Sequence, residues 1–236
     1  MNIKILLLGI ITLMISCTSS TTVNSAPESA KIVSLDTTSN YFLLDFADAL
    51  TAEDYYQILD TLDKASAIDY FFLRLAYTKT PEYSGYELGI SDSLKEIESY
   101  FEEDKYREAE GVLVNVLSTH FVNIRAHMLG GYLYNQLGDS IKSQYHYGIY
   151  DSLLTSIYYS GDGNTPRSAY IVISTKEEYA FLNWYGLRSR EQSLIYEDDH
   201  SFDLLKAKDE EAKDAFDIYF NIDLVLNNLR SSLRQK

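Results

Sequence analysis

The chain has 236 residues, of which 46% are hydrophobic, so it is long and apolar enough to bury a sizeable core. Its 20 basic and 35 acidic side chains give a net charge of −15 at pH 7, so we expect no nucleic-acid partner, because an acidic surface repels phosphates. Cys17 is the only cysteine, which excludes an intramolecular disulfide and leaves no thiolate metal cluster or cysteine nucleophile for the mature domain.

The amino terminus has the layout of a secretory signal. One positive charge, Lys4, precedes an apolar run from Ile5 to Ile15. A transmembrane helix is the competing interpretation, but crossing the hydrocarbon takes about 20 apolar residues, and this run ends at Ser16. The sequence therefore predicts export and removal of residues 1–16.

The next feature is the stretch Leu13-Met14-Ile15-Ser16-Cys17, which resembles the lipobox of bacterial lipoproteins. The resemblance implies that the thiol of Cys17 takes a diacylglycerol and that its freed amine can take another acyl chain. Each buried CH₂ contributes about 0.8 kcal/mol, so two or three chains make a durable anchor. We expect attachment to the cell envelope at the outer membrane. The alternative is an ordinary signal peptide cut near Ala26, which would leave a soluble protein.

The charge of the mature chain bears on its contact with the membrane. Removing residues 1–16 takes away Lys4 and leaves 19 basic against 35 acidic side chains, a net charge of −16. Anionic lipid headgroups repel such a surface, so we expect membrane contact through the lipid alone.

Residues 17–31, which comprise the lipidated cysteine and a small, polar stretch, have no apolar periodicity and predict a flexible tether. The roughly 200 residues that follow suit one compact domain or two small ones. We divide them into a mainly helical part at 32–160 and an α+β part at 161–236, and expect the two parts to pack as one globular unit.

Two helices are expected early in the helical part. Thr51 can cap a helix at 51–64, where apolar side chains recur at spacings of three and four. Residues 68–77 are aromatic or apolar on nearly every face, which favours a buried helix.

The middle of the chain carries the clearest helical pattern. A capping box at Ser93-x-x-Glu96 is expected to begin one helix, and a second follows Asp104. A third helix stops at Gly138, and a fourth runs through Leu153. The short links imply antiparallel neighbours.

The two pairs of helices look like a repeat. Sliding the first pair over the second by 34 residues places Asp104 on Gly138, and the pattern resembles two tetratricopeptide-type hairpins. Ile97 departs from it, since the second unit has the small Gly131 at that position. Two such repeats are not stable alone, so we expect them to pack against the flanking segments rather than form a solenoid.

After a turn at 160–164 the pattern becomes extended. The β-branched run at 169–174 predicts a strand, and Thr175-x-x-Glu178 predicts a second capping box at the start of a short helix. The acidic run 197–199 is interpreted as a solvated turn.

The carboxyl-terminal part predicts a small sheet. Strands are expected at 192–196, 202–208 and 216–222, and their short connectors favour antiparallel pairing. A terminal helix at 224–234 can cover one face of it. We therefore expect an α+β fold, in which tetratricopeptide-like helical hairpins precede a small, mainly antiparallel sheet with flanking helices.

Five short stretches stand in a fixed order along the chain: Leu73-Arg74-Leu75-Ala76-Tyr77, Ser160-Gly161-Asp162-Gly163, Ala169-Tyr170-Ile171-Val172-Ile173, Glu177-Glu178-Tyr179 and Tyr219-Phe220-Asn221-Ile222-Asp223. They resemble the family known as domain of unknown function 4919, over about residues 60 to 225. The family is one of exported Bacteroidota proteins, so the resemblance implies export and supports the lipid anchor. It assigns no activity.

Two histidines are candidates for a metal or catalytic site. His127 and His146 lie on successive predicted helices, about 11 residues before and 8 residues after the turn at Gly138. Their offset along the axis is only about 4.5 Å at 1.5 Å per residue, so they can meet. Two imidazoles with a nearby carboxylate can begin a metal or acid/base site. Packing or hydrogen bonding explains the pair equally, and no third ligand is defined.

Three carboxylates are further candidates. Asp162, between two glycines, can bind a cation, although such a triplet also simply makes a turn. Glu177 and Glu178 resemble a carboxylate pair suited to proton transfer, but adjacent residues on a helix point in different directions, and Glu178 is expected to serve the cap.

The 21 tyrosines include clusters at Tyr145-His146-Tyr147 and Tyr158-Tyr159. Exposed tyrosines can bind glycans or protein segments, whereas buried ones fill a core. No nucleophile elbow, zinc motif, phosphate loop or dinucleotide fingerprint is present, so we expect no cofactor. The leading hypothesis is a non-catalytic, lipid-anchored module that binds an envelope protein or glycan. The alternative is an envelope hydrolase or metal-dependent enzyme that uses His127, His146 and Asp162.

Overall fold

Helices precede the sheet in the computed structural model, which describes residues 39–62, 68–209 and 215–234. These residues form nine α-helices and one four-stranded sheet, which confirms the expected α+β class. The predicted signal sequence, the predicted lipidation site Cys17 and the predicted tether lie outside the described residues. Within the described ranges, no helix combines the length and apolarity that crossing a membrane requires.

The first three helices are α1 (Phe42–Asp48), α2 (Ala52–Thr61) and α3 (Tyr70–Tyr77). Thr51 caps α2 as predicted, because its hydroxyl accepts from the Asp54 amide while the Asp54 carboxylate accepts from the Thr51 amide at 2.8 Å. Burial of Leu73 to Tyr77 confirms the predicted buried helix. Helix α1 was missed, since seven residues are too few for a clear period.

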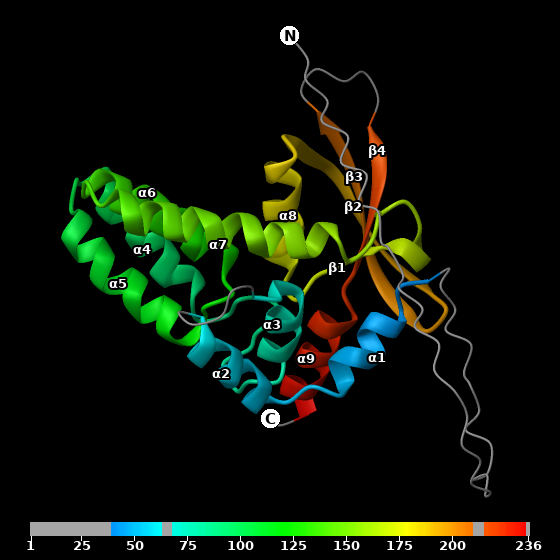
Figure 1. The fold of residues 1–236 in the computed structure, drawn as a ribbon. Coiled ribbons are helices and arrows are strands. Elements are labelled where there is room, and N and C mark those ends of the chain that lie inside the picture. Colours follow the sequence, from blue (N-terminus) through cyan, green and yellow to red (C-terminus); the bar gives the residue numbers. More distant parts are fainter. Residues whose placement is uncertain (1–38, 63–67, 210–214, 235–236) are drawn as a thin grey trace, which may run out of the picture. The chain divides into compact units, whose positions relative to one another are not determined.

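Two antiparallel hairpins follow, α4 (Ser91–Glu102) with α5 (Tyr106–Thr119) and α6 (Ile124–Gln136) with α7 (Ser140–Tyr158), as Figure 1 shows. The capping box predicted at Ser93 is wrong, because α4 already begins at Ser91. Ile90 and Leu94 are both buried in the hairpin core, and burying two large apolar side chains outweighs the roughly 1 kcal/mol of a cap.

Glycines let α6 and α7 approach closely. A Cβ atom added to Gly131 would lie 2.5 Å from a ring carbon of Tyr147, and one added to Gly130 would lie 2.9 Å from the His146 ring. Asp104 and Gly138, 34 residues apart, both adopt positive φ after the first helix of their hairpins. These features agree with the proposed offset, while kinship with tetratricopeptide repeats stays a prediction.

The sheet contains β1 (Tyr170–Ile171), β2 (Leu187–Glu197), β3 (His200–Asp209) and β4 (Phe216–Asn221), in the order β1-β4-β3-β2. Strands β2, β3 and β4 pair antiparallel as predicted, and β1 pairs parallel with β4. The strand predicted at 169–174 is only two residues long, because the Ile173 amide donates to the Glu177 carboxylate rather than to a neighbouring strand.

The hairpin between β2 and β3 turns at Asp198 and Asp199, which both have positive φ. Two successive residues in this conformation are typical of the tight turns that join antiparallel strands. The acidic run is therefore a turn, as predicted.

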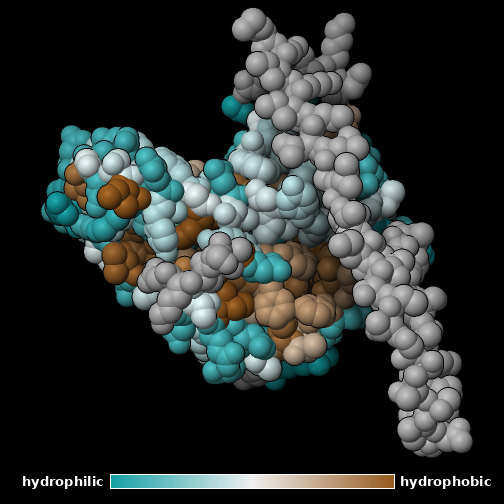
Figure 2. Space-filling view, viewed as in Figure 1, coloured by the Kyte–Doolittle hydropathy of each residue, from teal (hydrophilic) through white to brown (hydrophobic). Residues whose placement is uncertain are grey.

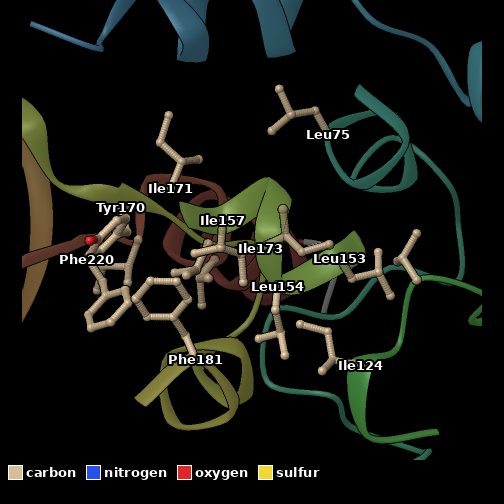
Figure 3. Packing of buried hydrophobic residues seen from close by; sticks show 14 of the residues in the cluster. Leu75, Ile124, Leu153, Leu154, Ile157, Tyr170, Ile171, Ile173, Phe181 and Phe220 are labelled. Carbon is tan, nitrogen blue, oxygen red and sulfur yellow. The ribbon is translucent and has the colours of Figure 1, made fainter. Parts of the chain in front are cut away.

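The remaining helices are α8 (Thr175–Trp184) and α9 (Asp223–Arg234). Ser174, not Thr175, caps α8, since its hydroxyl accepts from the amides of Lys176 and Glu177. The cap role predicted for Glu178 is therefore wrong. The main core lies where α3, α7, α8, β1 and β4 meet, and Figure 3 shows Leu153, Leu154 and Ile157 of α7 at its centre.

Candidate functional site

Both α7 and α8 end in two adjacent aromatic residues that face solvent. Tyr158 and Tyr159 end α7 and are 41% and 79% exposed, while Trp184 and Tyr185 end α8 and are 36% and 47% exposed. The ring centroids of Tyr158 and Tyr185 are 6.2 Å apart, and each lies 5.2 Å from its chain neighbour in the set. These four side chains, the aromatic surface, therefore form one patch from two helix ends.

Asp162 lies beside this patch. The charges of Tyr185, Tyr158 and Asp162 all act on Tyr170, whose pKa is raised to about 12, chiefly by burial. The Asp162 side chain is exposed and accepts a hydrogen bond from the Asn164 amide at 2.9 Å. Bonds from the Ser168 hydroxyl and the Asn164 amide lower the pKa of Asp162. Its carboxylate is thus ionised at neutral pH and held by its own loop.

Two hollows meet at Tyr159. One, of about 400 Å³, is lined by Asp162 and Arg167, and the other, of about 910 Å³, is lined by Asp69 and Asp151. Both hollows also share Leu43 and Ser160. We call the joined hollows the aromatic-acidic groove.

The wall of the groove opposite α7 is apolar. It contains Leu43 of α1 together with Ile68, Tyr70 and Phe71 at the start of α3. Figure 2 shows apolar side chains gathered over α1 and α3 on this face of the molecule. The groove therefore combines an exposed tyrosine, an apolar wall and three carboxylates.

The two candidate histidines do meet, as predicted. Their Nδ1 atoms are 3.0 Å apart, and His127 Nε2 lies 2.6 Å from the Phe121 carbonyl oxygen. A carbonyl only accepts, so Nε2 of His127 carries the proton and its Nδ1 is the acceptor. His146 must then donate from Nδ1, which gives the pair a defined arrangement of protons.

This arrangement of the two histidines fits a structural role in helix packing better than metal binding or acid/base catalysis. Burial lowers the pKa of His127 to about 3 and that of His146 to about 4, so both rings stay neutral. The one lone pair of His127 already points at the His146 proton, and neither ring lines the groove. Asp162 lies in the groove and is not among the groups that act on either histidine. The described ranges hold no group of three or more potential metal ligands.

The adjacent glutamates point to different partners, as the sequence predicted. Glu177 forms a buried ion pair with Arg74, with 2.9 Å between Nε and Oε1. Glu178 is fully buried, and its carboxyl group faces that of Asp203 on β3. Arg74 and Asp203 were missed as partners. A charged residue inside the apolar run 70–77 was the one signal that could have revealed Arg74.

The Tyr145-His146-Tyr147 cluster divides between core and surface. Tyr145 and Tyr147 are 47% and 40% exposed, whereas His146 is buried and stacks on Tyr134 with ring centroids 5.3 Å apart. None of the three lines the groove. Of the two tyrosine clusters, only Tyr158-Tyr159 therefore belongs to the candidate site.

Comparison with known proteins gave one match. The family model described as "Domain of unknown function (DUF4919)" matches residues 60–231, which include the aromatic surface, Asp162, the buried ion pair of Arg74 with Glu177 and the buried carboxyl pair of Glu178 with Asp203. No curated protein and no solved structure matches the chain.

Proposed function

Because this chain belongs to the domain of unknown function 4919 family, whose description assigns no activity, we propose a function from the groove itself: glycan binding by a lipid-anchored module of the cell envelope. The observation that carries the proposal is Tyr159, which is 79% exposed and stands between two hollows that both contain carboxylates. The expected ligand is an extended, neutral glycan.

The chemistry of a neutral sugar fits these groups. The C–H face of a pyranose ring packs on a flat aromatic ring, and a tyrosine offers such a face at low entropic cost. Sugar hydroxyls donate to carboxylates, and hydrogen bonds to ionised acceptors are about twice as strong as neutral ones. Asp69, Asp151 and Asp162 supply such acceptors on both sides of Tyr159. Their charge also disfavours anionic glycans.

The low pKa of Asp162 supports binding rather than hydrolysis. A general acid must hold a proton near neutral pH, whereas the bonds to Asp162 favour its ionised form. The groove lining given above contains no histidine. We therefore favour a non-catalytic module over the envelope hydrolase.

Tyr159→Ala is expected to weaken binding of a neutral oligosaccharide about tenfold or more, because it removes the ring at the junction of the hollows. A glycan array identifies the oligosaccharide, and calorimetric titration measures its affinity for the full chain. Tyr196→Ala is the matched control, since Tyr196 is 66% exposed on β2 and does not line the groove. The control should bind as tightly as the wild type.

Two outcomes would count against glycan binding. One is an array on which no neutral glycan is retained, and the other is equal affinity of wild type and Tyr159→Ala. If basic peptides bind instead, and Tyr159→Ala abolishes that binding, the occupant is a protein segment whose cations pair with the three aspartates.

A second part of the proposal is the anchor at Cys17, supported by the lipobox-like stretch before it. Cys17→Ala is expected to abolish labelling by a fatty-acid probe and to move the protein from the detergent phase into the aqueous phase. Ser19→Ala, two residues away, is the control and should stay labelled. Sucrose-gradient fractionation then tests the expected outer-membrane location. An unmodified thiol in the intact mass of the wild-type protein would refute the anchor.

A further inference from the structure

A second cavity, of about 240 Å³, lies between α6, α7, α8 and the segment that precedes α4. It shares no lining residue with the aromatic-acidic groove. Its apolar walls are Ile124 and Met128 of α6, Tyr150 of α7 and Ala180 of α8. A water molecule occupies about 30 Å³, so the space suits a ligand of roughly eight to ten heavy atoms.

Two cationic side chains line the same cavity. Lys176 is exposed in the first turn of α8, and Arg125 is 41% exposed at the start of α6. Arg125 pairs with Glu98 at 2.5 Å, whereas Lys176 makes no ion pair within the described part of the chain. An ammonium group beside an apolar pocket is suited to an anionic group on a ligand whose body is apolar.

The carboxylates of the cavity are already engaged. Glu177 is neutralised by Arg74. The Glu87 carboxylate accepts from the Ser174 hydroxyl at 3.0 Å, and burial raises the pKa of Glu87. The charge of Lys176 acts on Glu87, but Lys176 is exposed and forms no ion pair within the described ranges, so it is the cavity group best placed to favour an anionic ligand over a neutral one.

The backbone conformation of one lining residue, Glu87, supports ligand binding in this cavity. Glu87 has φ +53, a conformation that costs a non-glycine residue free energy and that clusters at binding and active sites. Glu87 also joins the cavity to a smaller one of about 30 Å³, where the Tyr77 hydroxyl lies 2.6 Å from His120 Nδ1.

We propose that this cavity binds a small amphiphilic carboxylate, whose apolar body packs against Ile124, Met128 and Ala180 and whose carboxylate pairs with Lys176. The site is separate from the glycan groove, so either can fail without the other. It gives the module a ligand of a second chemical class.

Phenylacetate, with ten heavy atoms, is a suitable probe, and phenylacetamide is its neutral counterpart of the same size. Calorimetric titration of the full chain is expected to give an affinity for phenylacetate about fivefold higher than for the amide. Lys176→Gln should remove that preference by weakening phenylacetate about fivefold and leaving the amide unchanged. Lys95→Gln is the control, since Lys95 lies on the exposed face of α4 and pairs with Asp92.

A cavity-filling variant tests the location independently. Ala180→Phe should abolish binding of both probes while a thermal melt reports whether the variant is folded. The proposal is overturned if phenylacetate does not bind at about 10 mM, if the amide binds equally well, or if Lys176→Gln binds phenylacetate as the wild type does.

Discussion

Glu178→Gln is expected to stabilise the protein at alkaline pH and to flatten the fall of its free energy of unfolding between pH 7 and pH 9.5. Glu178 is fully buried, and neither of its carboxyl oxygens accepts a hydrogen bond from a donor within the described residues. Its carboxyl group faces Asp203, which is 5% exposed on the central part of the sheet. Two ionised carboxylates in this position would repel each other in a medium of low polarity.

The fall of stability with rising pH follows from the pKa of Glu178, which is raised from 4.5 to about 10, first by burial and then by the charge of Asp203. The folded protein therefore keeps a proton that the unfolded chain loses above pH 4.5. Stability is fully present below that pH and is lost as pH rises towards about 10, by roughly 1.4 kcal/mol per pH unit for one proton. Glutamine has no proton to lose and can still donate to Asp203.

The chosen pH range separates this effect from the histidines. Burial lowers the pKa of His127 and His146, so their contribution is present above pH 6.5 and is lost as pH falls below it. Denaturant titrations from pH 7 to 9.5 therefore exclude the histidines. Burial also raises the pKa of Tyr55, Tyr77 and Tyr83, but the loss that they add near pH 9.5 is common to wild type and variant, so the difference between the two proteins reports on the carboxyl pair. We expect the variant to exceed the wild type by about 1 to 3 kcal/mol at pH 9.

Glu191→Gln is the control for this experiment, because Glu191 is exposed on β2. The free energy of unfolding of Glu191→Gln should fall with rising pH as steeply as that of the wild type. A wild-type protein whose stability is constant from pH 7 to 9.5, or a Glu178→Gln protein that loses stability at the same rate as the wild type, would contradict a proton held by Glu178 in the folded state.

Arg74→Ala is expected to lower the free energy of unfolding by about 3 to 5 kcal/mol, because it leaves Glu177 charged and buried without its partner. The guanidinium is completely buried and makes four hydrogen bonds. Two go to Glu177, one to the Ser156 hydroxyl at 3.2 Å and one to the Ile171 carbonyl at 3.0 Å. One side chain therefore ties α3 to α7, β1 and α8.

Arg74→Ala should also weaken binding in the groove, since Ser156 lines the larger hollow and accepts a hydrogen bond from Arg74. Chemical denaturation measures the stability, and the oligosaccharide titration measures the groove. Arg74→Met combined with Glu177→Leu should be more stable than Arg74→Ala, because the double change leaves no buried charge. It should stay below the wild type, because the Ile173 amide loses its acceptor.

An exposed ion pair supplies the comparison for Arg74. Lys95 and Asp92 on α4 are 69% and 96% exposed, so Lys95→Ala should change stability by less than about 0.5 kcal/mol. A loss below about 1 kcal/mol for Arg74→Ala would show that water reaches Glu177 in the variant, and it would contradict the expectation that the variant leaves a buried, unpaired charge.

The elements with a strong local signal were predictable. The period of apolar side chains located both helical hairpins and three strands, and the distance of His127 and His146 from Gly138 predicted their contact. The misses were places where packing overruled a local rule. Burial of Ile90 set the start of α4 in place of the Ser93 box, and the partner of Glu178 proved to be Asp203 rather than a helix amide.

The candidate site was predicted only in its parts. Tyr158, Tyr159 and Asp162 were named from the sequence, yet nothing in it placed them beside Trp184 and Tyr185 or on a groove with Asp69 and Asp151. Asp69 caps α3, Asp151 and the two tyrosines belong to α7 and its cap, and Trp184 and Tyr185 end α8, so their distances depend on how α3, α7 and α8 pack. The Lys176 cavity was missed for the same reason.

By itself, the sequence determined the α+β class, the order of the elements, the family and the acidic charge, because each depends on composition or on neighbours within a few turns of the chain. The tertiary structure alone decided which charges are buried together. Arg74 and Glu177 are 103 residues apart, and Glu178 meets Asp203 only because α8 packs on the sheet. Periodicity records which face of an element is apolar, whereas the partner of a buried polar group is set when distant faces come together.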